Sequence, residues 1–414
     1  MYKRKKDKSW DFNGVNTKEF THCYHTYPAM MIPQVARKLL TEKKPQNIDL
    51  KLVFDPYLGS GTTLVECCLL GIDCIGTDIN PLAKLISEVK CKVFEINKIE
   101  NEFEKINESF KKFRNDYKIK KNIVNITNHE FWYDEIILKK LAFIEEKINE
   151  ICQQENIPFF NVILSEIIRE VSFTRNNEFK RYKMNEEMLK KFNPNPFLIF
   201  ENKYNRNISG LKDFKNNSKK SKVIVDNFNT VYEIPKYIEN ESVDMIVTSP
   251  PYGDSKTTVA YGQFSRWANE WFNFENAKNI DEKLMGGKTQ KTIELNTNSI
   301  KNELNQIKLK DEKRYYEVIT FLKEYENSIN NISKLVKKDG KVCFVVGNRT
   351  VKGINIPLDF FTAEKFINNN FELNEIIVRN IPNKKMPKLN SPSNKIGEKT
   401  STMNNEYIVI LTKK

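Results

Sequence analysis

Apolar and polar positions along the chain follow patterns that indicate strands alternating with helices. Residues 51–71, "KLVFDPYLGSGTTLVECCLLG", combine a short apolar run, a glycine-containing turn and an apolar helical segment. Residues 72–91, "IDCIGTDINPLAKLISEVKC", repeat this order with an acidic residue at the end of the apolar run. Such strand–helix repeats predict βαβ units, whose strands lie parallel in one sheet.

The pattern changes between about 95 and 221, where segments with helical spacing such as "DEIILKKLAFIEEKINEICQQ" replace the strands. A tract rich in Lys and Asn closes this part of the chain. We interpret 95–221 as a mainly helical insertion. It separates 1–94, the first part of the sheet domain, from 222–414, its second part.

Strand patterns resume after the insertion, in "KVIVDNF" (222–228) and "SVDMIVTSPPY" (242–252). The polar segment 276–312 predicts a mobile loop with helical parts, and a long helix follows that we expect to end at Gly340. "FELNEIIVR" and "EYIVILTK" predict a closing antiparallel pair around a loop rich in Pro and Lys at 382–404. The basic residues 1–20 fit neither pattern and are expected to be loose.

Composition narrows the class of protein. With 39% hydrophobic and 29% charged residues, and no apolar run near the ~20 residues of a membrane span, the chain is expected to be globular and cytoplasmic. No apolar stretch of a signal peptide follows the basic N-terminus. The net charge of +13 suits a polyanionic partner, although a soluble protein whose Lys and Asn content reflects codon bias explains it equally well. Seven cysteines without a CxxC pair, and three histidines, argue against a metal site.

The turn "FDPYLGSGTT" (54–63) carries the first candidate chemistry. Gly59 and Gly61 let the backbone approach a ligand closely, and the helix N-terminus behind them offers free N–H donors. Asp78 ends the following strand, where a carboxylate can accept both hydroxyls of a ribose. An ordinary tight turn and a helix N-cap are the alternatives. Together the two features favour a nucleoside cofactor, and because no phosphate-binding lysine follows, S-adenosylmethionine fits.

Asp226 and Asn227 end a further apolar strand. At this position a side chain and a backbone amide can read the adenine edge of the same cofactor. The alternative is a plain turn, in which Asp and Asn are common.

The turn "SPPY" carries the second candidate chemistry, and its residues are Ser249, Pro250, Pro251 and Tyr252. Proline lacks an N–H group, so the turn presents carbonyl oxygens without competing donors. With the serine hydroxyl they can accept the two hydrogens of an exocyclic amino group, while the tyrosine stacks on an extruded base. The alternative is a proline-rich turn with a core tyrosine.

These residues resemble the motifs of the S-adenosylmethionine-dependent DNA amino-methyltransferases. "DPYLGSGTT" is similar to that family's cofactor motif, "TSPPY" to its catalytic motif, and "THCYHTYPAMMIP" (21–33) to the motif that encloses the methionine part. The resemblance implies a doubly wound, mostly parallel, seven-stranded α/β sheet with a closing antiparallel hairpin. It extends the predicted cofactor site to the following residues: Tyr27, Pro28, Asp55, Tyr57, Ser60, Thr62, Thr63 and Ile79.

The resemblance also implies double-stranded DNA as the partner. The insertion 95–221, with Lys180 and Arg181 at its basic end, is the first candidate for reading DNA, and 276–312 and 382–404 are rivals. Asp254 and Arg266 follow the catalytic turn and are expected to line the pocket of the target base. For each of these side chains a solvated or capping role is the alternative.

Ser249 favours cytosine N(4) as the target, because within the family a serine before Pro-Pro is commoner in cytosine enzymes and an aspartate is typical of adenine enzymes. Carbon-5 cytosine enzymes need a nucleophilic cysteine that usually follows a proline, and since no cysteine of this chain does so, the sequence argues strongly against that chemistry. The family resemblance suggests restriction-modification, with a partner endonuclease. Adenine N(6) methylation, RNA methylation and a catalytically idle DNA-binding subunit stay as alternatives.

Overall fold

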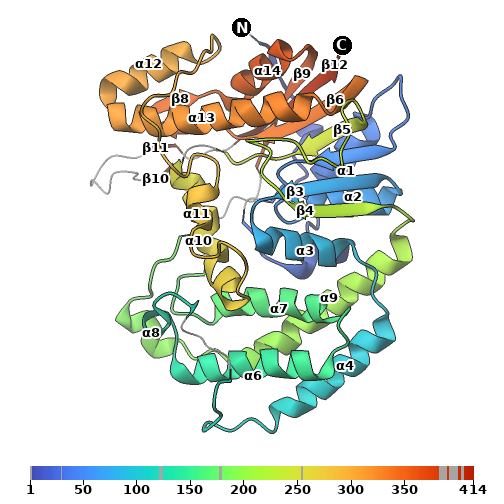
Figure 1. Cartoon of the computed structure of the whole chain (residues 1–414), viewed down its shortest axis with the longest axis vertical. Coiled ribbons are helices and arrows are strands. Elements are labelled where there is room, and N and C mark those ends of the chain that lie inside the picture. The colour runs from blue at the N-terminus through green and yellow to red at the C-terminus, as the bar shows by residue number, and fades with distance from the viewer. Residues whose placement is uncertain are drawn as a thin grey trace.

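A mixed sheet and a helical insertion divide the molecule into an upper and a lower part (Figure 1). The computed structural model describes residues 2–28, 30–120, 125–176, 180–252, 255–381, 389–390, 400–401 and 405–414. The hairpin loop expected at 382–404 therefore lies almost wholly outside the described residues, as does Asp254. None of the described helices is long and apolar enough to cross a bilayer.

The sheet has eight strands in the order β1-β9-β12-β6-β5-β2-β3-β4. Neighbouring strands from β6 to β4 run parallel, whereas β12 is antiparallel to both β6 and β9. This confirms the expected α/β class, the mostly parallel sheet and the closing hairpin. The bounds are β1 Arg4–Lys6, β2 Leu52–Asp55, β3 Asp73–Asp78, β4 Val223–Asn227, β5 Val243–Thr248, β6 Val336–Val346, β9 Phe371–Asn380 and β12 Asn405–Lys413.

The eighth strand, β1, was not expected, because it comes from the basic N-terminal segment. It pairs parallel with β9 at the sheet edge. Arg4 donates two hydrogen bonds to Asp359, at 2.7 and 2.8 Å, and its guanidinium lies 4.2 Å from the Phe360 ring. These contacts join residues about 355 positions apart, so no local pattern could indicate them.

Helices cover both faces of the sheet. On one face lie α1 (Pro33–Glu42) and α2 (Thr62–Leu70), and on the other α12 (Lys301–Lys310), α13 (Glu312–Ser333) and α14 (Leu358–Asn368). Along β5, Met245 and Val247 pack with the first group and Ile246 with the second. Burial on both faces explains why this strand reads as a continuous apolar run. Two short strands, β7 (Arg349–Val351) and β8 (Ile354–Ile356), form a separate hairpin.

The long helix ends earlier than expected. It stops at Ser333, and Gly340 lies inside β6. A Cβ atom at Gly340 would lie 2.8 Å from the carbonyl oxygen of Lys337 and from Val336 Cγ1 of the same strand, and 3.0 Å from the carbonyl oxygen of Asp244 on the neighbouring strand. The glycine therefore serves close strand packing, which the sequence pattern could not distinguish from a helix end.

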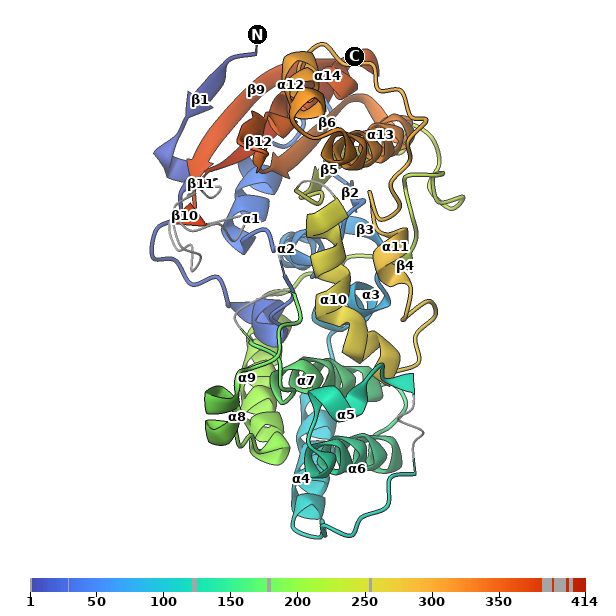
Figure 2. The same cartoon turned by 90° about the vertical axis from the view of Figure 1, so that its left-hand side faces the viewer.

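The insertion is mainly helical, as expected, and lies below the sheet (Figures 1 and 2). Its helices are α4 (Ile96–Phe110), α5 (His129–Trp132), α6 (Glu135–Ile151), α7 (Ile157–Glu170), α8 (Glu186–Lys191) and α9 (Pro196–Asn217). Of these, α4, α6, α7 and α9 share one apolar core with α3 (Pro81–Cys91) and with Trp267 and Trp271 of α10 (Ser255–Trp271), and Trp132 of α5 packs against it. Because α10 begins shortly after the predicted catalytic turn, Ser249 to Tyr252, it connects that turn to the insertion.

Candidate functional site

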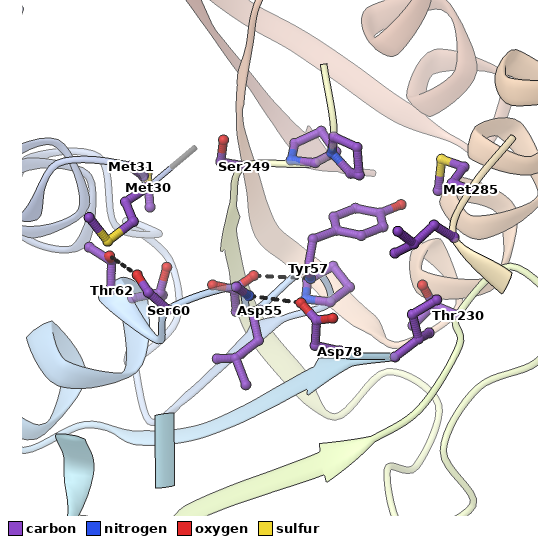
Figure 3. Close-up of a pocket in the computed structure, with 18 of the residues that line it drawn as sticks. Met30, Met31, Asp55, Tyr57, Ser60, Thr62, Asp78, Thr230, Ser249 and Met285 are labelled. Atoms are coloured by element: carbon purple, nitrogen blue, oxygen red, sulfur yellow. Dashed lines mark hydrogen bonds between the residues drawn. The ribbon is translucent and has the colours of Figure 1, made fainter. Parts of the chain in front are cut away.

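A cavity lies where the parallel strands end, and it brings together both predicted motifs (Figure 3). The glycine turn after β2 and the end of β3 form one side, and the turn after β5 forms another. The predicted site residues that line it are Tyr27, Pro28, Asp55, Tyr57, Gly59, Ser60, Thr62, Thr63, Asp78, Ile79, Ser249, Pro250, Pro251 and Tyr252. They come from segments nearly 200 residues apart, which only the parallel sheet places side by side.

The glycine turn is held by its backbone geometry. Gly59 has a φ of +52° and donates its N–H to Asp78 Oδ2 at 2.9 Å. Gly61 has a φ of +74° and forms the N-cap of α2, where a Cβ atom would lie only 2.7 Å from Ser87 Oγ. Gly61 is therefore needed for the shape of the turn, although it does not line the cavity. Behind the turn, the buried Lys90 Nζ donates to the carbonyl oxygen of Ser60 at 2.8 Å, and burial lowers the pKa of Lys90 to about 7.

Asp78 presents a carboxylate to the cavity. Its two oxygens accept the N–H groups of Gly59 and Asn80, at 2.9 and 2.8 Å. Burial raises the pKa of this carboxyl group, and the two N–H donors counteract the rise. Each carboxylate oxygen can accept a second hydrogen bond, so Asp78 can still bind hydroxyl groups of a ligand.

The carboxyl group of Asp55 connects the glycine turn with the Ser249–Tyr252 turn. Its Oδ1 accepts the hydroxyl of Thr248 at 2.5 Å and the N–H of Tyr57 at 3.2 Å. Thr248 directly precedes the catalytic turn, so the ends of β2 and β5 are joined by a side chain as well as by the sheet. Burial raises the pKa of Asp55 to about 6.

Asn80 organises the far wall of the cavity. Its Nδ2 donates to Tyr27 Oη at 2.9 Å and to Ser265 Oγ at 2.8 Å, while its Oδ1 accepts from Asn269 Nδ2 at 3.1 Å. One buried side chain thus fixes Tyr27 in the cavity wall and attaches α10 to the start of α3. The sequence indicated only a helix start here, because the partners of Asn80 lie far away in the chain.

The catalytic turn folds its tyrosine back onto its serine. Ser249 Oγ lies 2.8 Å from Tyr252 Oη, and the tyrosine hydroxyl also donates to Glu406 Oε1 at 3.3 Å. Both prolines line the cavity with these two residues. All four residues of the turn therefore border the same space as the glycine turn.

Several cavity residues were not predicted. They are Met30, Met31, Pro56, Leu58, Phe228, Asn229, Thr230, Val231, Leu284 and Met285. In Figure 3 Met285 lies on the same side of the cavity as Thr230. The loop of Met285 is held because Gly286 donates its N–H to Glu324 Oε2 of α13 at 2.6 Å. For Leu284 and Met285, the sequence offered one signal: they form an apolar pair directly before Gly286-Gly287 in the otherwise polar segment 276–312.

Asp226 and Asn227 do not line the cavity, whereas the next four residues do. Asp226 Oδ2 accepts the hydroxyl of Tyr237 at 3.0 Å, and Asn227 Nδ2 donates to the carbonyl oxygen of Asp78 at 2.7 Å. Their adenine-reading role stays a prediction, and the cavity contacts at this strand end come from the residues after them.

The basic residues predicted to bind substrate also lie outside the cavity lining. Arg266 Nε donates to the buried Glu270 at 3.0 Å. The guanidinium of Arg181 lies 5.3 Å from the Trp267 ring, and burial lowers its pKa. Arg169, which sequence reasoning did not single out, donates to the carbonyl oxygen of Lys180 at 3.5 Å. These arginines pack where α10 meets the insertion, so their substrate-binding role stays a prediction.

A family model and two curated relatives indicate one family. Residues 2–88 match the family model for N6/N4 DNA methylases, described as DNA methylase. The type II methyltransferase M.MvaI of Kocuria varians is 39% identical over 97% of this chain and 92% of its own length. The type II methyltransferase M.MjaII of Methanocaldococcus jannaschii is 41% identical over 22% of this chain and 18% of its own. Among solved structures, an rRNA methyltransferase of Streptomyces viridochromogenes has 8% identity and a TM-score of 0.32, covering 94% of this chain and 87% of that one.

Proposed function

The chain belongs to the S-adenosylmethionine-dependent DNA amino-methyltransferases, and from this premise we propose that it methylates the N(4) amino group of cytosine in duplex DNA. The observation that carries the proposal is the single cavity lined by Asp78 and the glycine turn on one side and by Ser249 and Tyr252 on the other. A methyl donor and an acceptor base can meet only where both motifs face one space.

The residues on the glycine side fit S-adenosylmethionine. Asp78 has acceptor capacity for the ribose hydroxyls, and the N-terminus of α2 at Thr62 and Thr63 offers N–H donors for a carboxylate. The partly apolar wall with Val231 and Met285 suits a flat adenine ring, which has to be held without a phosphate anchor. When bound there, this cofactor supplies an electrophilic methyl group on a sulfonium centre.

The residues of the catalytic turn orient the acceptor. The Ser249 hydroxyl and the turn's carbonyl oxygens accept the hydrogens of an exocyclic amino group, so that the nitrogen lone pair points away from them. Tyr252 offers its ring to an extruded base. Because Ser249 is neutral, the turn does not carry the full charge that an aspartate would place beside the base. The choice of cytosine over adenine rests on the resemblance, because within the family a serine at this place is commoner in cytosine enzymes.

The insertion 95–221 is the proposed target-recognition region. It exposes two aromatic side chains, Phe131 at 51% and Tyr182 at 46%. Lys183 Nζ lies 3.8 Å from the Phe131 ring, which adds a positive charge to this exposed surface. Aromatic rings beside basic groups suit contact with bases and phosphates. The insertion is attached to the catalytic turn through α10, which would couple reading of DNA to placement of the base.

The direct test uses S-adenosylmethionine with a tritiated methyl group and duplex DNA, followed by digestion and identification of the labelled nucleoside. We expect N(4)-methylcytosine at one short sequence. N(6)-methyladenine would overturn the choice of base, and label on tRNA but on no DNA would overturn the DNA substrate.

The proposed biological role is modification within a type II restriction-modification system, in which a partner endonuclease cuts the unmethylated site. Genomic DNA from cells that express the protein should become resistant to an endonuclease of the same specificity. Methylation spread over many unrelated sequences would contradict this role.

A further inference from the structure

A line of hydrogen bonds leads from Ser249 out of the catalytic turn to the closing hairpin of the sheet. Ser249 Oγ lies 2.8 Å from Tyr252 Oη, and Tyr252 Oη donates to Glu406 Oε1 at 3.3 Å. Glu406 stands near the start of β12, and its other carboxylate oxygen forms an ion pair with Arg379 of β9. Neither Glu406 nor Arg379 belongs to the three motifs that carry the family resemblance.

The carboxylate of Glu406 is held in place. Glu406 and Arg379 are direct partners in the antiparallel register of β12 and β9, and their side chains are 14% and 4% exposed. Arg379 Nε also donates to the carbonyl oxygen of Trp10 at 2.8 Å. Asp11 adds a hydrogen bond from the N–H of Asn380 at 2.7 Å. The N-terminal segment, the hairpin and the Ser249–Tyr252 turn thus meet around the Glu406–Arg379 ion pair.

The chemistry of these groups sets the direction of the hydrogen bonds. An ionised carboxylate can only accept, so the proton of the Tyr252 hydroxyl points to Glu406. The tyrosine oxygen is then an acceptor, and the proton of Ser249 points to it. The remaining lone pairs of Ser249 Oγ are left free to accept hydrogens of a target amino group. Hydrogen bonds in such a chain polarise one another, which strengthens the last acceptor.

If its proton were not directed toward Tyr252, the Ser249 hydroxyl would be poorly suited to a site beside a nucleophilic amine. It rotates freely and can donate its own proton to the nitrogen lone pair that has to attack the methyl group. We propose that Glu406 is a positioning residue for methyl transfer, which acts through Tyr252 to keep Ser249 an acceptor toward the target amino group. The inference rests on the proposed function and explains how a neutral serine can serve at this place.

A double-mutant cycle tests the route through Tyr252. The variants are Tyr252→Phe, Glu406→Gln and the combination of both, and each is measured for kcat, for KM of DNA and for cofactor affinity. Tyr252→Phe keeps the ring and the Glu406–Arg379 pair, so it separates the hydroxyl from folding and stacking. Each single change should lower kcat by roughly 10- to 100-fold, as expected for a hydrogen bond to a charged group. Cofactor affinity should stay unchanged.

The combined variant carries the decisive readout. If Glu406 acts through the tyrosine hydroxyl, Glu406→Gln costs nothing further once that hydroxyl is gone. Glu375→Gln is the matched control, because Glu375 stands on β9, the strand paired with β12, forms an ion pair with Lys43 at 2.5 Å and lies outside the cavity lining. It should leave kcat at the wild-type value.

The outcomes separate the two proposals. Additive losses in kcat, or a Tyr252→Phe variant as active as wild type, would overturn the positioning role while DNA methylation by the wild-type protein stands. Equal losses in Glu406→Gln and Glu375→Gln would assign both to general destabilisation and also overturn it. A wild-type protein that labels no DNA would overturn the proposed function and, with it, this inference.

Discussion

The predicted cofactor residues around the glycine turn and Asp78 (the cofactor side) and the predicted substrate residues Arg181 and Arg266 (the DNA side) differ in their surroundings. On the cofactor side, the turn residues and Asp78 come within 25 positions of one another, and nearly all line one cavity. On the DNA side, Arg181 was predicted to contact DNA and Arg266 to line the pocket of the target base. The two side chains pack against Trp267 and Glu270, and these roles stay predictions. Backbone-determined positions can be read from a motif, whereas the role of a long charged side chain depends on what packs around it.

The largest effect on activity is expected from a substitution in the Ser249–Tyr252 turn. Ser249→Ala removes an acceptor for the target amino group, and we expect kcat to fall by roughly 100- to 1000-fold. Cofactor affinity should change by less than about two-fold, since Ser249 holds no part of the proposed cofactor. Ser242→Ala is the control, because Ser242 directly precedes β5 whereas Ser249 directly follows it. This variant should keep the kcat of the wild-type protein. A loss of cofactor affinity as large as the loss of turnover would contradict the assignment.

A second test asks whether the glycine turn depends on backbone geometry. Gly61→Ala should lower the free energy of unfolding by about 3 kcal/mol, because it combines a positive φ with a clash against Ser87. Gly14 has nearly the same φ, +73° against +74°, but open space around it. Gly14→Ala should therefore cost only about 1 kcal/mol. Equal midpoints in urea for the two variants would show that the contact with Ser87 is unimportant.

The buried Asp55 predicts a pH dependence of stability. Because burial raises its pKa to about 6, the folded protein keeps a proton that the unfolded chain loses above roughly pH 4. Stability therefore falls as pH rises through this window and then levels off. Relative to Asp55→Asn, the wild-type protein should lose about 2 to 3 kcal/mol between roughly pH 4 and pH 7. Parallel urea-unfolding profiles for the two proteins across this range would contradict the shift.

Asp78→Asn tests the cofactor side directly. Loss of the charge should weaken binding of S-adenosylmethionine by about 10- to 100-fold in calorimetry, the size of a charged hydrogen bond. Asp73→Asn, at the start of the same strand, is the matched control and should bind normally. Asp226→Asn belongs in the same series, because a loss as large as that of Asp78→Asn would support the adenine-reading role predicted for Asp226.

The smallest effect is expected on the DNA side, where two basic residues two positions apart have different surroundings. Lys183→Ala should reduce the salt dependence of DNA binding by about one unit of slope, as for one lost phosphate contact. Arg181→Met should leave that slope unchanged, because its guanidinium packs over Trp267. The reverse result would return Arg181 to the DNA-binding surface, as charge alone suggested.

Much of the fold was accessible from local patterns. The alternation of apolar runs and helical segments predicted the parallel sheet, the closing hairpin and the helical insertion. Two errors have a common cause: Gly340 packs against a neighbouring strand and does not end a helix, and Arg4 joins the sheet through Asp359. The pairing of β6 with β5 and the contact of Arg4 with Asp359 both join segments distant in sequence, and local propensity does not contain them.

The sequence by itself determined the chemistry of each motif. Glycines at 59 and 61, an acidic residue at a strand end and a proline turn after an apolar run have meanings that follow from backbone sterics and hydrogen-bonding capacity. Only the tertiary structure decided which side chains surround them. Asn80 reaches Tyr27 and α10, Met285 closes the cavity wall, and Glu406 reaches Tyr252, because the sheet and α10 bring distant segments within hydrogen-bond or van der Waals distance.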